Sequence, residues 1–252
     1  TANNNTGVGH KALESNTTGT SNAAVGSNAL DANTTGAYNT ALGMNALGAT
    51  TTTNNNVAVG YDALAANSNG ERNTAIGANS LRTGNTGFSN CTAVGEGALE
   101  FNTANNNTAV GRNALEANTT GTSNTAVGGL SLDVNTTGHN HTAIGYESLS
   151  SNTTANNNTG LGRSALRYTT TGGDNTAVGG GVLQYNTTAA DNTAIGYLAM
   201  DVNTTGSRNV AVGTHALDAN TVGGDHVAVG HSALGSNTTG IRSTAVGFSA
   251  LA

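Results

Sequence analysis

The stretch from Asn107 to Ser123 reads N-T-A-V-G-R-N-A-L-E-A-N-T-T-G-T-S, and close copies of it fill the chain. The residue before a recurrent glycine marks each copy: Val8, Val25, Leu42, Val59, Ile76, Val94, Val110, Val127, Ile144, Leu161, Val178, Ile195, Val212, Val229 and Val246. The position of the marker rises by 17 from one copy to the next, except for steps of 18 and then 16 around Val94. The fifth position of the repeat is glycine in all fifteen copies, and the ninth is leucine in all but one, where Met200 stands. Such a period predicts stacked structural units.

Each repeat is too short for two helices with their turns, so we predict one extended coil per repeat. The run N-T-A-V-G is predicted to be a strand, with Thr and Val on one face and Asn, Ala and Gly on the other. A second short strand is predicted at Ala-Leu. Asn-Thr-Thr-Gly is predicted to be a corner, because Asn and Gly tolerate left-handed backbone and Asn can bond its own local backbone. The predicted fold is all-β, a parallel β-solenoid (β-roll) of about 15 coils that forms one domain over residues 1–252.

The repeat also predicts how the coils stack. Val would lie over Val and Leu over Leu, which gives a core of two aliphatic ladders. Two columns of asparagine, one at the first and one at the twelfth repeat position, would hydrogen-bond along the stack, as amide ladders do in cross-β structures. The strip of Ala and Gly at the third and fifth positions either packs inside its own coil or lets another backbone approach closely. We favour the second interpretation, in which the strip contacts further copies of the chain, with three chains side by side as one arrangement.

The composition excludes several classes of protein. Charged residues make up 9% and aromatic residues 4% of the chain, and there is no proline or tryptophan. The net charge of −6, with only eight Lys plus Arg, gives no basic face for nucleic acid. No apolar run approaches the roughly 20 residues that span a membrane. The absence of proline suits a solenoid, because a proline would remove a hydrogen bond from the ladder.

The repeats Asn107 to Leu115 and Asn124 to Leu132 resemble the head repeats of trimeric autotransporter adhesins. Similar repeats occur in phage tail-fibre proteins, and the resemblance covers the entire chain. It implies export, a location at the cell surface or on a virion, and binding through broad polar surfaces rather than a pocket. In the adhesin family the heads are trimeric left-handed β-rolls whose coils are usually shorter than the 17-residue coil of this chain.

A longer period lies above the coil. The run Thr1 to Asn5 recurs at Thr103 to Asn107 and at Thr154 to Asn158, which keeps a 51-residue register of three coils. We also predict that the ends of the solenoid are uncapped. Solenoids normally carry capping elements, so the chain is either a segment of a longer fibrous protein or a subunit whose copies stack end to end into a filament.

Carboxylates recur after the conserved leucine, and in adjacent coils they would lie about 5 Å apart. A cation such as Ca²⁺ could bridge them, and Glu100, Glu116 and Asp133 are the candidate ligands. The alternative is a solvated acidic stripe, which we favour; we predict no catalytic residue, no cofactor site and no other metal site. The single cysteine, Cys91, lies where the register slips and is predicted to be a small buried residue rather than a nucleophile.

Asn-x-Thr sequences raise the question of glycosylation. The candidate acceptors are Asn16, Asn33, Asn118, Asn135, Asn152, Asn186, Asn203 and Asn237. The competing interpretation is that Asn-Thr-Thr recurs only because these residues form the corner of the coil. A modified asparagine could not also stack in a ladder.

Three functional classes follow from these features. The first is a structural or adhesive extracellular fibre without catalysis, which self-associates as a homotrimer or an end-to-end filament and has a host-surface or polysaccharide receptor. The second is an ice-binding solenoid, because columns of Thr on a sheet could order water. The third is a polysaccharide-binding or polysaccharide-processing solenoid, which the few scattered aromatic residues disfavour. We predict the first class and no enzyme activity.

Overall fold

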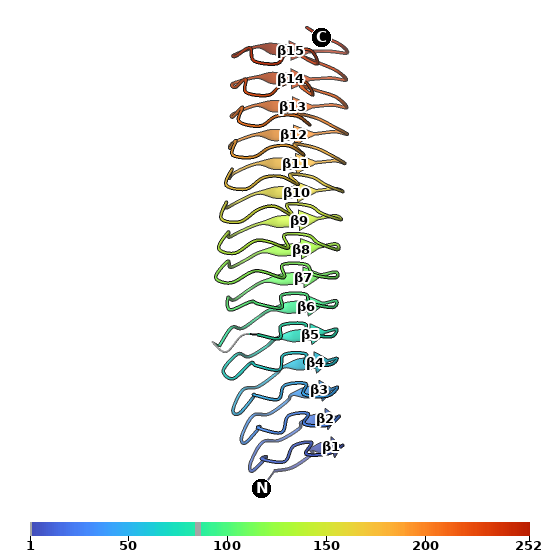
Figure 1. Cartoon of the computed structure of the whole chain (residues 1–252), viewed down its shortest axis with the longest axis vertical. Helices are drawn as coiled ribbons and strands as arrows, with labels where there is room; N and C mark the ends of the chain where they lie inside the picture. The colour runs from blue at the N-terminus through green and yellow to red at the C-terminus, as the bar shows by residue number, and fades with distance from the viewer. Residues whose placement is uncertain (1, 84–86) are drawn as a thin grey trace. The chain divides into compact units, whose positions relative to one another are not determined.

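The computed structural model describes residues 2–83 and 87–252, and in these residues all regular structure is β-strand. Contacts between backbone atoms divide the chain into two compact units, residues 1–123 and residues 124–252. Each unit is a parallel β-solenoid with one strand per coil (Figure 1). The predicted fold class is therefore confirmed. The first copy of the predicted three-coil super-repeat starts at Thr1, which lies outside the described residues.

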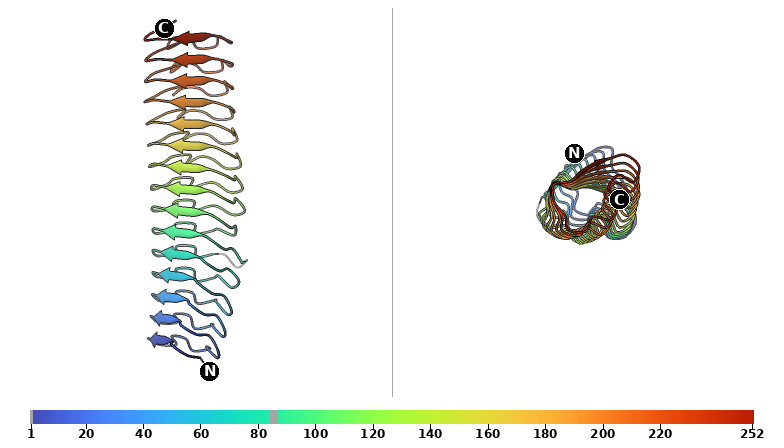
Figure 2. Two further views of the ribbon diagram at one scale, coloured as in Figure 1. Left: turned by 180° about the vertical axis from the view of Figure 1, so that it is seen from behind. Right: turned by 90° about the horizontal axis from the view of Figure 1, so that it is seen from above.

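The strands are three residues long and recur with the sequence repeat. The first unit contains β1 (Thr6–Val8), β2 (Ala23–Val25), β3 (Thr40–Leu42), β4 (Val57–Val59), β5 (Thr74–Ile76), β6 (Thr92–Val94) and β7 (Thr108–Val110). The second unit contains β8 (Thr125–Val127), β9 (Thr142–Ile144), β10 (Thr159–Leu161), β11 (Thr176–Val178), β12 (Thr193–Ile195), β13 (Val210–Val212), β14 (Val227–Val229) and β15 (Thr244–Val246). Within each unit, consecutive strands pair in parallel and lie on one side of the coil (Figure 2).

The strand register places each residue beside its counterpart in the next coil. Between β8 and β9, for example, Ala126 pairs with Ala143, which holds the same position in the following repeat. The pairing continues through the irregular coil, where Ala75 of β5 pairs with Ala93 of β6 although that repeat is slightly longer than the others. The side chain of Phe88 in that coil is fully buried.

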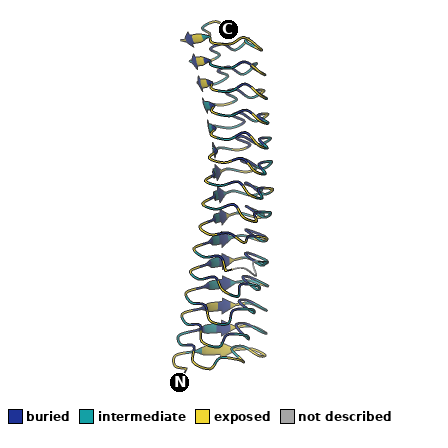
Figure 3. Cartoon of the chain, turned by 90° about the vertical axis from the view of Figure 1, so that its left-hand side faces the viewer, coloured by how far each residue is buried: buried dark blue, intermediate teal, exposed yellow. Residues whose placement is uncertain are grey.

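The strand alternates as predicted, but the face that points inward is the opposite of the predicted one. The central residue of every strand after β1 is buried, and it is alanine in all of these except β10; Ala143, for example, is buried, whereas Ile144 beside it is 38% exposed. Figure 3 shows this pattern of burial along the coils. The predicted ladder of Val in the core is therefore wrong. The predicted ladder of Leu is right, since Leu149 is 0% exposed and its counterparts from Leu30 to Leu234 are at most 4% exposed.

The second predicted strand is also wrong. The residues after the conserved glycine form a series of turns, and the conserved leucine has a left-handed backbone, with φ of 55° at Leu149. The residue two positions earlier is left-handed as well, as at Glu147 with φ of 56°. This alternation keeps the leucine side chain inside the coil while its N–H donates to the next coil, as from Leu149 to the Ala165 carbonyl at 3.0 Å.

The predicted corner at Asn-Thr-Thr-Gly is present, and its asparagine bonds local backbone as expected. The Asn33 amide donates to the Gly36 carbonyl three residues later, at 3.1 Å. The corner glycine has no left-handed backbone, however, and alanine takes its place at Ala155 and Ala189. Left-handed φ values occur instead at the last position of the coil, as at Asn157 with φ of 61°.

The inside of each coil is thus part apolar and part polar. Alanine and leucine fill one part, and the two predicted asparagine columns fill the other. In the first column, the Asn175 carbonyl oxygen Oδ1 accepts the backbone N–H of Asn192 at 3.1 Å, and its amide Nδ2 donates to the Ala189 carbonyl at 2.9 Å. The second column links side chain to side chain, as from Asn220 Nδ2 to Asn203 Oδ1 at 2.9 Å. The columns therefore satisfy buried backbone groups that no strand reaches.

Candidate functional site

The most regular surface of each unit is the outward side of its strands, which we call the strand face. It consists of the first and third residues of every strand, and the first is threonine in eleven of the fifteen strands. The third residue is always Val, Ile or Leu. In interior coils this third side chain is either exposed, as at Ile76 (40%) and Ile195 (40%), or half-buried, as at Val127 and Val178. All these side chains are among the described residues and none of them is charged.

Rows of exposed aliphatic side chains are costly in water, and on soluble proteins they mark interaction surfaces. Adjacent strands of a sheet are about 4.8 Å apart, so the strand face repeats Thr and Val at that spacing. The sequence signal for this surface was available, because the strand alternation already separates Thr and Val from Ala. The larger apolar residue of the strand lies outside and the smaller one inside, which is the reverse of the usual preference for burying Val and Ile.

The strip of small residues that we predicted as a contact for another chain lies inside the coil. Ala177 and Ala194 are fully buried. The glycine at the fifth position faces the next coil: a Cβ atom added to Gly162 would lie 2.3 Å from the Gly179 carbonyl oxygen. The strip is therefore an internal packing feature, and the prediction that it contacts further copies is wrong.

The candidate glycosylation sites belong to the second asparagine column. Six of them are fully buried: Asn33, Asn118, Asn135, Asn152, Asn186 and Asn203. The remaining two, Asn16 and Asn237, are half-buried. In each case the amide nitrogen that would carry a glycan donates a hydrogen bond, as from Asn16 to the Gly19 carbonyl at 3.1 Å. A glycan on the buried members is incompatible with this packing. The burial of these asparagines therefore favours the interpretation in which Asn-Thr-Thr recurs because it forms the corner.

The carboxylates of the acidic stripe, Glu100, Glu116 and Asp133 among them, are not arranged as a metal site in the described residues. Glu100 accepts from the Arg82 guanidinium at 2.8 Å, and the pKa of Glu116 is raised by burial and then by repulsion from Glu100. Asp133 lies in the second unit and is half-buried. Over residues 2–83 and 87–252, no group of three or more His, Cys, Asp or Glu side chains is placed to hold a metal ion.

Cys91 is buried where the register slips, as predicted. It replaces asparagine in the first column, and its backbone N–H still donates to Asn73 Oδ1 at 3.0 Å. Burial raises the pKa of the thiol to about 11, so at neutral pH it is protonated and poorly nucleophilic.

Histidine replaces asparagine in the same column at His141 and His226. His141 Nδ1 accepts the backbone N–H of Asn158 at 3.1 Å, and its Nε2 lies 2.6 Å from the Ala155 carbonyl oxygen. A backbone N–H can only donate and a carbonyl can only accept, so the ring is neutral with its proton on Nε2. The ring thereby reproduces both hydrogen bonds of the asparagine side chain.

This neutral ring predicts sensitivity to acid. Burial lowers the pKa of His141, with a smaller contribution from the nearby His139. The unfolded chain then takes up the proton at higher pH than the folded chain does, so the free energy of unfolding falls as the pH drops below about 6.5. Protonation of Nδ1 also leaves the buried N–H of Asn158 without an acceptor, at a cost of about 1–3 kcal/mol. We expect the melting temperature of His141→Asn to fall less than that of the parent when the pH is lowered from 7.5 to 5. Equal decreases in the two proteins would contradict a neutral His141 ring in the folded chain.

No helix that the described residues form is long and apolar enough to cross a membrane. Comparisons with protein-family models, with curated proteins and with solved structures give no match for this chain.

Proposed function

We propose that this chain is a structural segment of an extracellular fibre, whose copies associate through the strand face. The observation that carries the proposal is the row of exposed and half-buried Val, Ile and Leu side chains, together with the absence of charge among them. Burying such a row would remove apolar surface from water at about 25 cal/mol per Å². The absence of charge means that no buried ion would oppose the contact.

A second copy of the chain is the partner that best fits this surface. The rows repeat at the rise of one coil, and a partner with another spacing would lose register within a few coils. A copy of the same solenoid has the same spacing, and it presents the same threonine and valine rows. Symmetric association of identical subunits is also the commonest form of assembly. The resemblance of the repeats to adhesin heads and tail fibres supports a location at a cell surface or on a virion and a non-catalytic, adhesive role.

The test compares masses in solution by sedimentation. The variant Ile144→Lys/Ile195→Lys places two charges on the strand face in coils that are not adjacent. The control, Val202→Lys/Val222→Lys, places two charges on exposed valines outside the strand face (36% and 51% exposed). We expect the parent and the control to sediment as oligomers and the strand-face variant as a single chain, all three with the same circular dichroism spectrum. A parent of single-chain mass at micromolar concentration would overturn the proposal.

Ice binding is the second candidate, and the regular threonine column of the strand face favours it. The strand face would then act on a crystal surface instead of a protein. The same variants separate the two functions. Inhibition of ice recrystallisation by a single-chain parent, lost in Ile144→Lys/Ile195→Lys and kept in the control, would support ice binding over self-association.

A further inference from the structure

A gap in the surface of the second unit interrupts the regular coils. Three glycines follow strand β11, and the second and third, Gly180 and Gly181, occupy positions where neighbouring coils carry side chains. A Cβ atom added to Gly180 would meet only ring carbons of Tyr197, at 3.6 and 3.8 Å. The result is an open cavity of about 220 Å³, which we call the glycine notch. Its lining residues are Arg163, Ser164, Arg167, Gly180, Gly181, Gln184, Tyr197 and Leu198.

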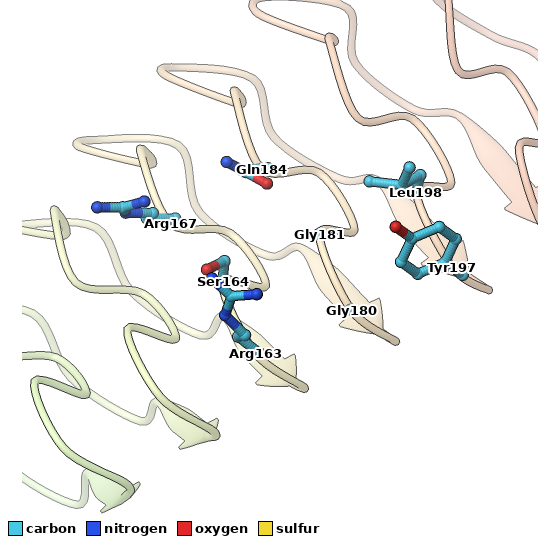
Figure 4. A pocket seen from close by; sticks show the side chains of 8 residues that line it. All are labelled: Arg163, Ser164, Arg167, Gly180, Gly181, Gln184, Tyr197 and Leu198. Carbon is cyan, nitrogen blue, oxygen red and sulfur yellow. The ribbon is translucent and has the colours of Figure 1, made fainter.

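The glycine notch lies between side chains of three successive coils. Figure 4 shows Arg163 on one side of the two glycines and Tyr197 on the other, with Gln184 near the middle. Arg163 and Tyr197 share the sixth repeat position, so without the glycines a side chain would stand between them. The notch therefore exists because one coil lacks the side chains that its neighbours have.

The lining is cationic in a chain whose net charge is −6. Two of the eight basic residues, Arg163 and Arg167, line the notch, and no carboxylate does. Arg167 is held in place, since its Nε lies 3.2 Å from Glu147 Oε2 and its guanidinium carbon 5.0 Å from the centre of the Tyr168 ring. Arg163 makes no ion pair within the part of the chain that the structure describes. Its guanidinium is thus available to an anionic ligand.

The other lining groups suit a sugar. Tyr197 is 59% exposed and its ring provides an apolar face, while Gln184 offers an amide for hydrogen bonds to hydroxyl groups; Ser164 lines the notch but is only 6% exposed. The notch is smaller than the roughly 300–1,000 Å³ pockets that enclose drug-sized ligands, so it fits one small residue. A guanidinium binds a planar carboxylate through two parallel hydrogen bonds.

We propose that the glycine notch binds a sugar residue that carries a carboxylate, with Arg163 on the carboxylate and Tyr197 on the sugar ring. This ligand class extends the adhesive role proposed above. The biological setting of the site rests on that proposed function, but the binding itself does not. A single notch of this size gives weak binding. Copies held together in one fibre would raise the overall affinity for a polymer of such residues.

The experiment measures binding of methyl β-glucuronide to the full chain by saturation-transfer NMR. Methyl β-glucoside, which lacks the carboxylate, and acetate, which lacks the sugar, are the reference probes. Two variants test the site: Arg163→Gln removes the charge, and Gly180→Leu fills the notch at a position whose backbone accepts a side chain. Arg242→Gln removes a surface charge outside the notch and is the matched control. We expect Kd for methyl β-glucuronide to rise about tenfold or more in both site variants and to stay unchanged in the control.

Three results would overturn the inference: equal binding of methyl β-glucoside, binding of acetate as tight as that of the glucuronide, or unchanged binding in Arg163→Gln. The outcome is independent of the mass in solution, because the notch lies within one chain. Binding by a single-chain parent would sustain the site while the fibre proposal fails. An oligomer that does not bind the probe would sustain the fibre proposal while the site fails.

Discussion

Gly145→Ala is expected to unfold the solenoid locally and to lower its stability by more than about 3 kcal/mol. Gly145 has φ of 135°, a backbone region that is essentially restricted to glycine and that costs other residues about 1–3 kcal/mol. The added Cβ would also lie 2.5 Å from the carbonyl carbon and oxygen of Gly162 in the next coil. Backbone atoms on both sides are held by the strand ladder, so neither can move away cheaply. Thermal and denaturant unfolding followed by circular dichroism measures the effect.

Gly180→Ala is the matched control for this substitution. Gly180 lies one position further along its own coil, and the added methyl group would meet only ordinary van der Waals contacts. We expect the control to change the stability by less than about 0.5 kcal/mol, as surface substitutions do. A Gly145→Ala protein as stable as this control would show that the coils can separate enough to admit a side chain.

Asn175→Leu is expected to be the next most damaging single change, with a loss of about 2–4 kcal/mol. Asn175 is fully buried, and its side chain both accepts the N–H of Asn192 and donates to the Ala189 carbonyl. Leucine is nearly the same size but makes neither hydrogen bond, and each buried group left unpaired costs about 1–3 kcal/mol. The free energy of unfolding in urea is the measurement.

Asn175→His provides a second variant at the same position. His141 already occupies this column, and the carbonyl it contacts, that of Ala155, corresponds to Ala189 in the coil of Asn175. We therefore expect the histidine variant to retain stability within about 1 kcal/mol at pH 8. If the leucine and histidine variants were equally destabilised, the contribution of Asn175 to stability would come from the shape of its side chain and not from its hydrogen bonds.

The sequence was sufficient to predict the coil length, the strand position and both asparagine columns. These features follow from the regular period, because a residue that recurs at the same position of successive repeats stacks on its counterpart in the next coil. The period could not decide which side of the strand points inward. A narrow coil that already holds Leu149 and two asparagines has room only for Ala143 on that side, so the larger Ile144 points to solvent. The volume of the whole coil, and not the alternation within one strand, decides which side chain points inward.

The left-handed leucines could not be predicted from residue preferences. A left-handed backbone costs an ordinary residue roughly 1–2 kcal/mol, and leucine has no side-chain group that compensates locally. The compensation comes from the stack: Leu149 buries its side chain fully, and its N–H reaches the Ala165 carbonyl. The glycine notch has one sign in the sequence, the run Gly179 to Gly181, but its lining depends on the side chains that the two neighbouring coils carry.

The irregular coil with Phe88 shows that one coil of this architecture can change length. β5 and β6 keep their register although the repeat that joins them is longer than the others, so the strand ladder tolerates an extra residue elsewhere in the coil. For protein engineering, the corner at the far end of a coil from its strand is a place to graft a foreign peptide. Since every coil has an equivalent corner, epitopes or enzymes could be displayed at intervals that are whole multiples of one coil rise, about 4.8 Å.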